Sequence, residues 1–338
     1  MKDAQPTATR QPRAHGARPA LPLRVGTRAS PLALVQTRDF LATLSHFCPV
    51  LRRPLLGETP VFEEHAIRTT GDAVQDRPLA EIGGKGLFAK EIHEALADHR
   101  VDFAVHSLKD LETSLPDDII LACTLPREDC RDALILGPET GRPDPADPFA
   151  CLPLGAVIGS SSVRRQAQML HRRPDLQFRL LRGNVQRRLD RTRAGDFDAT
   201  LLAYAGLRRL GLGAEADVVI DPAHMLPAAC QGIVGITLRG ADTELCDLLR
   251  GIEDPHARSV ALAERALLAE LDGSCRTPIG GLATHLPDGR LLLEGLVARA
   301  DGSFLLRRSI EGLASDAERL GRELGRDLRA DSPADLFV

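Results

Sequence analysis

The sequence predicts an α/β protein in which two domains with parallel or mixed sheets precede a small C-terminal α+β domain with an antiparallel sheet. Three observations support this prediction. Apolar, strand-like segments alternate with amphipathic, helix-like segments through two successive stretches of the chain. The C-terminal part instead has one long amphipathic segment followed by three apolar segments joined by short turns. Finally, 338 residues suffice for two or three domains of roughly 100 residues each.

The predicted first domain begins with a strand over residues 21–26. Ser30 and Pro31 then start a helix, because Ser as the N-cap accepts a hydrogen bond from an unpaired amide and Pro has no amide proton to lose. The further elements expected here are a strand over 61–68, a loop over 69–72, a helix over about 87–98 that follows Gly83-Gly84-Lys85-Gly86, and strands over 101–106 and 119–123. Loops at one edge of such a sheet are expected to carry the ligand site.

The predicted second domain repeats this alternation. Its expected elements are strands over 133–136, 156–159, 176–181 and 198–203, and helices that begin near Ser162, Asn184 and Gly206. Because each helix follows a strand, the turns between them fall at one predicted edge of the sheet. A strand over 232–238 then returns to the first domain, which makes that domain discontinuous in sequence.

The predicted third domain begins with an amphipathic helix over 255–271, whose apolar residues recur at helical spacing. Strands over 279–284, 291–299 and 304–310 follow, and then a helix to about residue 328. The boundaries expected from these elements are a flexible N-terminal extension over 1–20, a first domain over 21–126 and 231–250, a second over 131–226, and a third over 255–330.

The first 20 residues contain scattered Pro and Arg without hydrophobic periodicity, which predicts a flexible extension. This stretch lacks the apolar core of a secretory signal, and its lack of Ser disfavours a transit peptide. No apolar run approaches the roughly 20 residues of a membrane span, so we expect a cytoplasmic protein. The seven cysteines show no CxxC pair or Cys/His metal spacing, so neither a disulfide framework nor a bound metal is expected.

Positive charge is concentrated in one part of the chain. Twelve arginines and four acidic residues lie between Gly159 and Arg209, although the whole chain has a formal net charge of −4. Arginines at strand-to-helix turns, where backbone amides also point outward, favour binding of carboxylate or phosphate. A solvated surface is the ordinary alternative. Nucleic acid is disfavoured by the negative net charge and by an aromatic content of 3% without Trp.

Three further segments are candidates for chemistry. Lys109 and Asp110 follow a predicted strand, where a carboxylate beside an ammonium tends to stay ionised, although an ordinary exposed turn has the same pattern. Gly83-Gly84-Lys85-Gly86 lacks the eight-residue phosphate-loop pattern and predicts no nucleotide site. Cys275 lies in a Gly/Ser/Pro-flanked segment beside Arg276, and a lone cysteine is more often a small buried apolar residue than a functional one.

Seven segments, taken in order, closely resemble the porphobilinogen deaminase (hydroxymethylbilane synthase) family. The resemblance extends from about Leu23 to about Leu328, and several specific motifs occur in the correct order. The segments are Arg24 to Ala33, Gly83 to Phe88, His106 to Asp110, Gly159 to Gln166, Leu181 to Val185, Ala205 to Gly211 and Gly273 to Gly280.

The resemblance implies a fold, a cofactor and a reaction. The first two domains would be like type II periplasmic binding proteins, and the third would carry Cys275 as the thioether attachment point of a dipyrromethane cofactor. Asp110 matches the catalytic aspartate, which would stabilise positive charge on a pyrrole nitrogen while ammonia leaves porphobilinogen. The resulting electrophilic azafulvene would be attacked by the free α-carbon of the bound chain. A monomer that joins four porphobilinogens head to tail and releases linear hydroxymethylbilane by hydrolysis is expected.

The resemblance also implies roles for the cationic residues. The residues expected to hold the cofactor's acetate and propionate groups are Lys109, Ser162, Arg164, Arg165 and Arg188. Those expected to face the substrate or growing chain are Arg28, Ser30, Arg182 and Arg209, with Arg24 and Gln36 at further positions of the cleft. Each pyrrole brings two carboxylates, so a growing chain needs many cations.

The sequence departs from the family pattern at three positions near these motifs. Glu112 and Cys130 stand where Pro is usual, and Cys230 stands where Gly is usual; the two cysteines fall at the presumed hinges. Glu81 also occupies a position where some relatives have Lys. Two other function classes stay open on residues alone. A non-enzymatic anion-binding protein would need the arginines but not Asp110 or Cys275, and a nucleic-acid binder would need only the basic segment.

Overall fold

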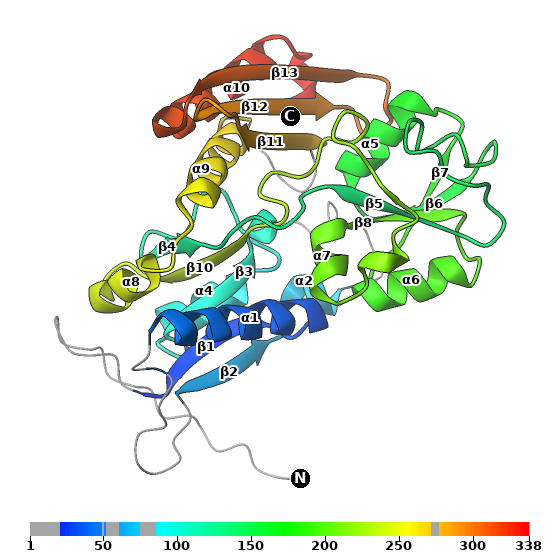
Figure 1. Cartoon of the computed structure of the whole chain (residues 1–338). Helices are drawn as coiled ribbons and strands as arrows, with labels where there is room; N and C mark the ends of the chain where they lie inside the picture. The colour runs from blue at the N-terminus through cyan, green and yellow to red at the C-terminus, as the bar shows by residue number, and fades with distance from the viewer. Residues whose placement is uncertain (1–20, 49–50, 52–60, 75–85, 272–276, 338) are drawn as a thin grey trace.

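The computed structural model describes residues 21–48, 51, 61–74, 86–271 and 277–337, and the following statements concern these residues. They form two α/β units side by side, with a third unit lying over one end of both (Figure 1). The expected extension over 1–20, and the segments containing Glu81, Lys85 and Cys275, lie outside the described residues.

The first unit is a five-stranded mixed sheet with the strand order β2-β1-β3-β10-β4. Strand β10 is antiparallel to both β3 and β4, whereas β1 is parallel to β2 and β3. Its strands are β1 (Leu23–Arg28), β2 (Phe62–Ile67), β3 (Phe103–Ser107), β4 (Ile119–Thr124) and β10 (Val234–Arg239). Its helices are α1 (Pro31–Phe47), α2 (Thr70–Ala73), α4 (Lys90–Ala97) and α8 (Thr243–Arg250).

The second unit has a similar five-stranded sheet, with the order β7-β6-β8-β5-β9 and with β5 antiparallel to β8 and β9. Its strands are β5 (Asp132–Leu136), β6 (Val157–Ser160), β7 (Gln177–Leu180), β8 (Ala199–Ala203) and β9 (Val218–Val219). Its helices are α5 (Val163–Arg172), α6 (Val185–Arg193) and α7 (Tyr204–Arg209). In each unit the internal antiparallel strand is the one that arrives from the other unit.

The chain therefore passes between the two α/β units twice. We call residues 125–131, between β4 and β5, the first crossover, and residues 220–233, between β9 and β10, the second crossover. The crossovers are joined by a backbone hydrogen bond, in which Glu128 N donates to Gly232 O over 3.1 Å. The expected return of the chain into the first sheet is confirmed by β10.

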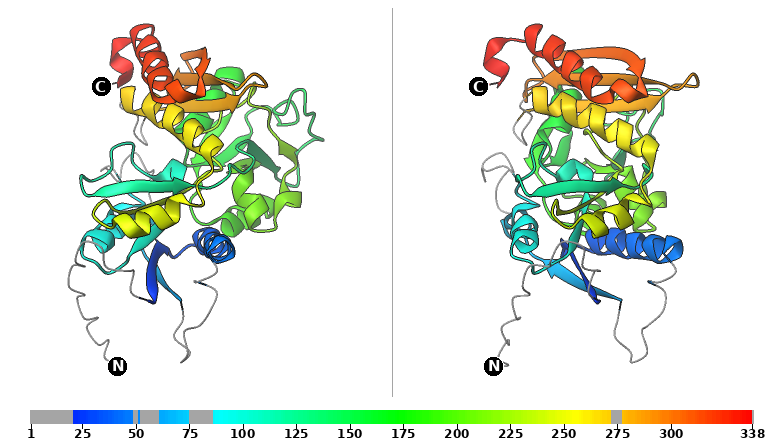
Figure 2. Two further views of the ribbon diagram at one scale, coloured as in Figure 1. Left: turned by 60° about the vertical axis from the view of Figure 1, so that its left-hand side comes forward. Right: turned by 90° about the vertical axis from the view of Figure 1, so that its left-hand side faces the viewer.

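The third unit is a three-stranded antiparallel sheet packed against two helices. Its elements are α9 (Pro255–Glu270), β11 (Ile279–His285), β12 (Arg290–Ala298), β13 (Leu305–Leu313) and α10 (Ala317–Ala330). The turned views place α9 between α10 and the first unit (Figure 2). The predicted fold class, two α/β units followed by a small antiparallel unit, is thus confirmed, and we propose that the three units are the domains expected from the sequence.

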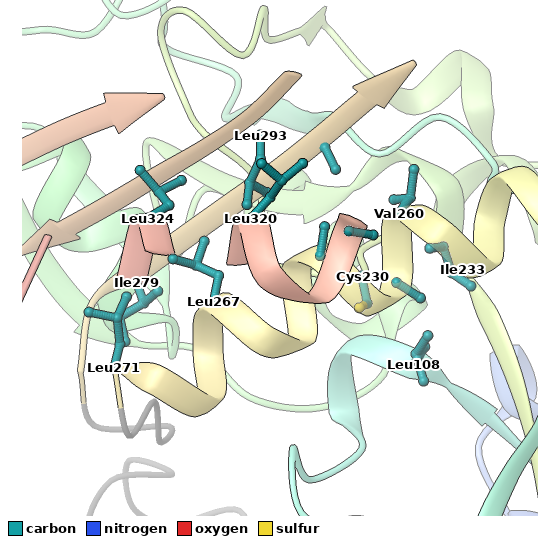
Figure 3. Close-up of a cluster of buried hydrophobic side chains, with 14 of the residues drawn as sticks. Leu108, Cys230, Ile233, Val260, Leu267, Leu271, Ile279, Leu293, Leu320 and Leu324 are labelled. Atoms are coloured by element: carbon teal, nitrogen blue, oxygen red, sulfur yellow. The ribbon is translucent and has the colours of Figure 1, made fainter. Parts of the chain in front are cut away.

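The third unit's apolar core extends into the other parts of the chain. Leu267, Leu293 and Leu320 are fully buried between α9, α10 and the sheet, and Leu108 and Cys230 belong to the same buried cluster (Figure 3). Leu108 begins the turn after β3, and Cys230 lies in the second crossover. Burial of these apolar side chains together therefore fixes the turn and the crossover against the third unit.

Several predicted helix starts are confirmed by their caps. Ser30, Ser162 and Asn184 are the N-caps of α1, α5 and α6, and each side chain accepts a hydrogen bond from a backbone amide three residues later. These caps satisfy amides that have no partner inside the helix. The second unit's first two strand-to-helix turns therefore lie where they were expected.

Three local predictions were wrong. Residues 70–73, expected to be a loop, form the short helix α2, because the Thr69 side chain accepts from Asp72 N and caps its first turn. Helix α4 begins at Lys90 rather than near residue 87. Helix α7 begins at Tyr204, directly after β8, so Arg208 and Arg209 lie in its last turn and not at its start.

Among the described residues, no helix is both long enough and apolar enough to span a membrane. The six cysteines in this part of the chain are free thiols, and the same residues contain no group of three or more potential metal ligands.

Candidate functional site

The site is built around a single 3-10 turn, Leu108–Asp110, which directly follows β3. Leu108 and Leu111 are buried in the core of the third unit, and Leu108 N donates to Ile233 O over 2.9 Å. Both flanks of the turn are therefore held by the protein. Between these flanks, Lys109 and Asp110 are partly exposed. Residues that contact a ligand must be accessible in this way.

Asp110 is held by Arg28, the last residue of β1. Arg28 NH1 donates to Asp110 Oδ2 over 3.1 Å. The other side of the same guanidinium donates to Asp72 in α2, from Nε to Oδ2 over 3.2 Å and from NH2 to Oδ1 over 2.5 Å. The Phe88 ring lies against the guanidinium, with its centroid 4.2 Å from Arg28 Cζ. One arginine thus joins two carboxylates.

The two carboxylates change the ionisation of this arginine. Burial acts to lower the pKa of Arg28, but the hydrogen bonds and charges of Asp72 and Asp110 outweigh it and raise the pKa. Burial likewise acts to raise the pKa of Asp72, and Arg28 and Thr69 outweigh it and lower the pKa. Arg28 and Asp72 are therefore both ionised at neutral pH.

Arg164 and Arg165, at the start of α5, are both buried and are held by Asp132. Arg164 NH2 donates to Asp132 Oδ2 over 2.8 Å, and Arg165 NH2 donates to Oδ1 over 2.7 Å. Arg164 NH1 also donates to Leu226 O over 2.6 Å, and Arg165 NH1 donates to Leu201 O over 2.8 Å. Burial acts to raise the pKa of Asp132, but the two arginines outweigh it and hold the pKa well below its usual range.

Lys109 is joined to these arginines through Gln231 of the second crossover. Lys109 Nζ donates to Gln231 Oε1 over 3.1 Å, and Gln231 Nε2 donates to Asp132 Oδ1 over 2.9 Å. Burial lowers the pKa of Lys109 from 10.5 to about 8, with Arg165 acting in the same direction and Asp110 opposing it. The site therefore contains a cation that can lose its proton near physiological pH.

Arg188 lies near the same charges. Its Nε donates to Gly183 O over 3.0 Å, and it forms no ion pair with a carboxylate of the described residues. Burial and the neighbouring Arg165 and Arg182 lower the pKa of Arg188 to about 10, while Asp110 opposes this shift. Neighbouring cations that destabilise one another's charge would be relieved by an added anion.

The residues in this part of the chain therefore fit a ligand with several carboxylates. Arg165 acts electrostatically on both Lys109 and Arg188, and Arg182 also acts on Arg188. The buried Asp132 pairs with Arg165 and acts on Lys109, so it neutralises only part of this positive charge. Their excess of positive charge matches the acetate and propionate groups of a dipyrromethane.

Two of the arginines expected to face the substrate reach across the unit boundary. Arg182 is buried, and its NH2 donates to Gly71 O in α2 of the first unit over 2.8 Å. Arg209 NH2 donates to Gly232 O in the second crossover over 2.7 Å. Both guanidiniums thus lie between the two α/β units.

The remaining predicted residues fall into three groups. Ser30 and Ser162 lie at the same sheet edges but use their hydroxyl oxygens as helix caps. Gln36 is buried, and its Oε1 accepts from Ser107 Oγ over 3.0 Å, next to the turn that carries Asp110. Arg24 lies elsewhere, because it is at the opposite end of β1 from Arg28, about 13 Å away at the usual rise per residue. It pairs there with Asp102.

The departures from the family pattern lie around this site. Cys230 has φ +61°, in the left-handed region where Gly is favoured, so this chain places a side chain on a backbone suited to Gly. Cys130 O accepts from Gln231 Nε2 over 2.7 Å. Glu112 lies between α4 and α9, with its Oε2 3.7 Å from His93 Nδ1 and its backbone O accepting from Arg265.

A second buried ion pair ties both crossovers to the third unit. Glu264 of α9 is fully buried and accepts from Arg127 NH1 over 2.6 Å and from NH2 over 3.3 Å. The same carboxylate accepts from Cys230 N and, over 2.6 Å, from Ala283 N. Arg127 Nε donates to Gln231 O over 2.9 Å, so this pair also supports the residue that contacts Lys109.

Sequence reasoning missed the carboxylates and the amide that organise these cations. Asp72, Asp132, Gln231 and Glu264 were not among the predicted site residues. Their partners are between 32 and 137 positions away in the chain, so no local motif reveals the pairings. The sequence did offer one signal for Asp72. This residue follows Gly71 in the loop expected over residues 69–72, between a predicted strand and a predicted helix.

Cys275, the expected attachment point, lies outside the described residues. In sequence it falls between the end of α9 at Glu270 and the start of β11 at Ile279.

Comparison with known families gives two matches that together span most of the chain. Residues 23–247 match the family model "Porphobilinogen deaminase, dipyromethane cofactor binding domain". Residues 259–330 match "Porphobilinogen deaminase, C-terminal domain".

Curated relatives agree with these matches. The porphobilinogen deaminase of Paracoccus denitrificans is 45% identical over 94% of this chain and 97% of its own length. The chloroplastic porphobilinogen deaminase of Oryza sativa subsp. japonica is 43% identical over 93% of this chain and 85% of its own length. Among solved structures, the periplasmic aliphatic sulphonate binding protein SsuA of Escherichia coli matches with a TM-score of 0.37 and 13% identity over 75% of this chain and 71% of its own. That likeness is too low to support a conclusion.

Proposed function

Because the chain belongs to the porphobilinogen deaminase family and contains its dipyrromethane cofactor-binding domain, we propose that it joins four porphobilinogens into linear hydroxymethylbilane, with loss of ammonia. This is a transferase reaction of tetrapyrrole biosynthesis. The observation that carries the proposal is the position of Asp110. Its carboxylate is fixed by Arg28 at the edge of a group of cations that includes Lys109 and Arg188.

We propose that the cofactor is attached through Cys275 and held by Lys109, Arg165 and Arg188. Arg164 helps to hold Arg165 in place, because Arg164 is buried and donates to the same carboxylate, Asp132. The Ser162 hydroxyl caps α5 and thereby holds the amide end of the helix on which both arginines lie. When bound, the dipyrromethane supplies the free pyrrole carbon to which the first substrate ring is joined.

Asp110 carries the proposed acid and base chemistry. A carboxylate beside a pyrrole nitrogen stabilises the positive charge that develops on it as the amino group leaves, and it can hold or return the proton of that nitrogen. Arg28 fixes the direction in which Oδ2 points, since its guanidinium is itself held on the other side. The third unit fixes the turn on which Asp110 lies.

Arg182 and Arg209 are proposed to meet the carboxylates of the incoming substrate and of the growing chain. Both bond backbone oxygens across the boundary between the α/β units, so a carboxylate ligand, which makes stronger charge-assisted bonds, can replace those contacts. Ser30 and Gln36 lie beside Arg28 and the Asp110 turn and complete the proposed substrate side.

We further propose that the protein works as a monomer in the cytoplasm. Support for a reducing compartment comes from the free thiols of the six cysteines in the described ranges. Analytical ultracentrifugation of the purified protein tests the oligomeric state.

The reaction is tested by incubating purified cofactor-loaded protein with porphobilinogen and measuring ammonia, substrate loss and released linear tetrapyrrole. The proposal predicts four ammonia molecules and four consumed porphobilinogens for each tetrapyrrole released. Binding of porphobilinogen without consumption would instead indicate a non-enzymatic anion-binding protein. Affinity for DNA that survives a polycarboxylate competitor would indicate a nucleic-acid binder.

A further inference from the structure

Asp72, a residue of α2 outside the set predicted from the sequence, makes the most extensive contact with Arg28. Two nitrogens of the guanidinium, Nε and NH2, face the two oxygens of Asp72. A bidentate arrangement of this kind fixes the plane of the guanidinium as well as its position. The third nitrogen, NH1, then points to Asp110.

The surroundings hold this arrangement in place. Thr69 Oγ1 donates to Asp72 Oδ2 over 2.9 Å and accepts from Asp72 N over 3.3 Å, so the carboxylate is fixed from behind. The Phe88 ring covers one face of the Arg28 guanidinium. Phe88 is itself close to α2, because a Cβ added at Gly71 would lie 2.4 Å from its ring. The plane of Arg28 therefore has little freedom to tilt.

The charges also bear on what Arg28 does. The Arg28 guanidinium lies between two carboxylates, and its Nε, NH1 and NH2 each already donate to a carboxylate oxygen. A substrate carboxylate arriving there would meet two carboxylates before it gained the arginine. This arrangement is therefore better suited to an arginine that orients Asp110 than to an arginine that binds the substrate.

We propose that Asp72 is a positioning residue for the reaction, which acts through Arg28 to aim the Asp110 carboxylate at the reacting ring. The main role of Arg28 is then to orient Asp110, and substrate binding by Arg28 is secondary. The helix that carries Asp72 is also the one that Arg182 of the second unit contacts, at Gly71 O. Asp110 is thereby connected to the opposite unit through Arg28, α2 and Arg182. This inference rests on the proposed function, because it assigns a role within that reaction.

The test is a comparison of wild-type holoenzyme with Asp72→Asn, which keeps the shape of the side chain and removes its charge. We expect kcat to fall by about tenfold or more, because misdirection of a catalytic group slows the chemical step, while KM changes by less than about threefold. Asp72→Glu, which keeps the carboxylate, is expected to recover part of the lost rate. A rise in KM with unchanged kcat would overturn the proposal, because it would place Asp72 in substrate binding.

A second measurement separates positioning from a purely structural effect. The addition of the first substrate ring is followed by intact mass in a single turnover, in wild-type and in Arg28→Lys backgrounds. If Asp72 acts through Arg28, Asp72→Asn slows the wild type but slows Arg28→Lys by less than about twofold, because coupled residues are not additive. An equal slowing in both backgrounds would overturn the proposal.

The matched control is Asp175→Asn. Asp175 forms the same two-point contact with Arg173, from Nε over 2.7 Å and from NH2 over 2.8 Å, in the second unit and outside the proposed site. It is expected to leave kcat and KM unchanged. Wild-type protein that adds no rings refutes the proposed function itself. Active wild-type protein with an equally active Asp72→Asn variant refutes this inference alone.

Discussion

Lys109 Nζ donates a hydrogen bond of 3.1 Å to Gln231 Oε1, and this contact joins the turn that carries Asp110 to the second crossover. Gln231 extends the connection to Asp132, which holds the two arginines at the start of α5. The candidate catalytic carboxylate and the cations of the second unit therefore belong to one network.

The charge of Lys109 gives the site a pH dependence. Its pKa, lowered to about 8 by burial, means that the ammonium is present below pH 8 and is lost as the pH rises through that value. We expect cofactor-free protein, incubated with porphobilinogen, to acquire its cofactor more slowly above about pH 8, because one carboxylate-binding cation has become neutral. Intact mass of samples between about pH 6.5 and about pH 9.5 measures the loaded fraction.

The variant Lys109→Met lacks this ionisation. It is expected to load slowly at every pH and to show no further decline near pH 8. Lys90→Met is the matched control, since the Lys90 side chain is 71% exposed on α4 and is expected to keep the wild-type profile. A decline of the same size in Lys109→Met would assign the pH dependence to another group.

Glu264 is expected to stabilise the junction of the three units. Glu264→Ala leaves Arg127 buried without its carboxylate and removes the acceptor for Cys230 N and Ala283 N. Breaking a buried pair in this way lowers the free energy of unfolding by about 3 to 5 kcal/mol. Urea unfolding curves measure the loss. Glu318→Ala, which breaks an exposed pair with Arg322, should cost less than about 1 kcal/mol, and equal losses would show that Glu264 has no special role.

Asp110→Asn is expected to separate cofactor binding from catalysis. The amide has the shape of the carboxylate but cannot stabilise positive charge on a pyrrole nitrogen, so turnover should fall by at least about a hundredfold. Cofactor content, measured by intact mass, should stay at the wild-type level, because the proposed cofactor ligands are other residues. Asp118→Asn, an exposed carboxylate of the same unit, is the control. Substantial turnover by Asp110→Asn would show that another group does the chemistry.

The elements that the sequence predicted correctly are those with a local physical signature. Ser30 caps its helix as expected, and the helices expected near Ser162 and Asn184 begin there, with these residues as N-caps. A hydroxyl or amide oxygen three residues before an unpaired backbone amide is a short-range signal. The alternation of strands and helices likewise predicted two parallel or mixed sheets, which the structure shows to be mixed, and the return of the chain as β10. The same local reasoning failed at α2, where the Thr69 cap begins a helix of only four residues.

The partners of the predicted cations were beyond sequence reasoning. Arg164 and Arg165 were expected to hold the cofactor, and both in fact share the buried Asp132, which lies on β5 and more than 30 positions away. Arg24 was expected at the site, but its place at the start of β1 puts it beside Asp102. Which cations have a protein carboxylate, and which keep their charge for a ligand, depends on contacts between strands that only the folded chain brings together.

The most direct test of the central claim is the intact mass of the purified protein, expressed in cells that make porphobilinogen, beside Cys275→Ser and Cys48→Ser. We predict that wild type and Cys48→Ser exceed the mass of their sequences by two linked pyrrole rings and give colour with Ehrlich's reagent. Cys275→Ser is predicted to have the mass of its sequence and give no colour. An unmodified wild-type protein, or the same added mass on Cys275→Ser, would contradict the account.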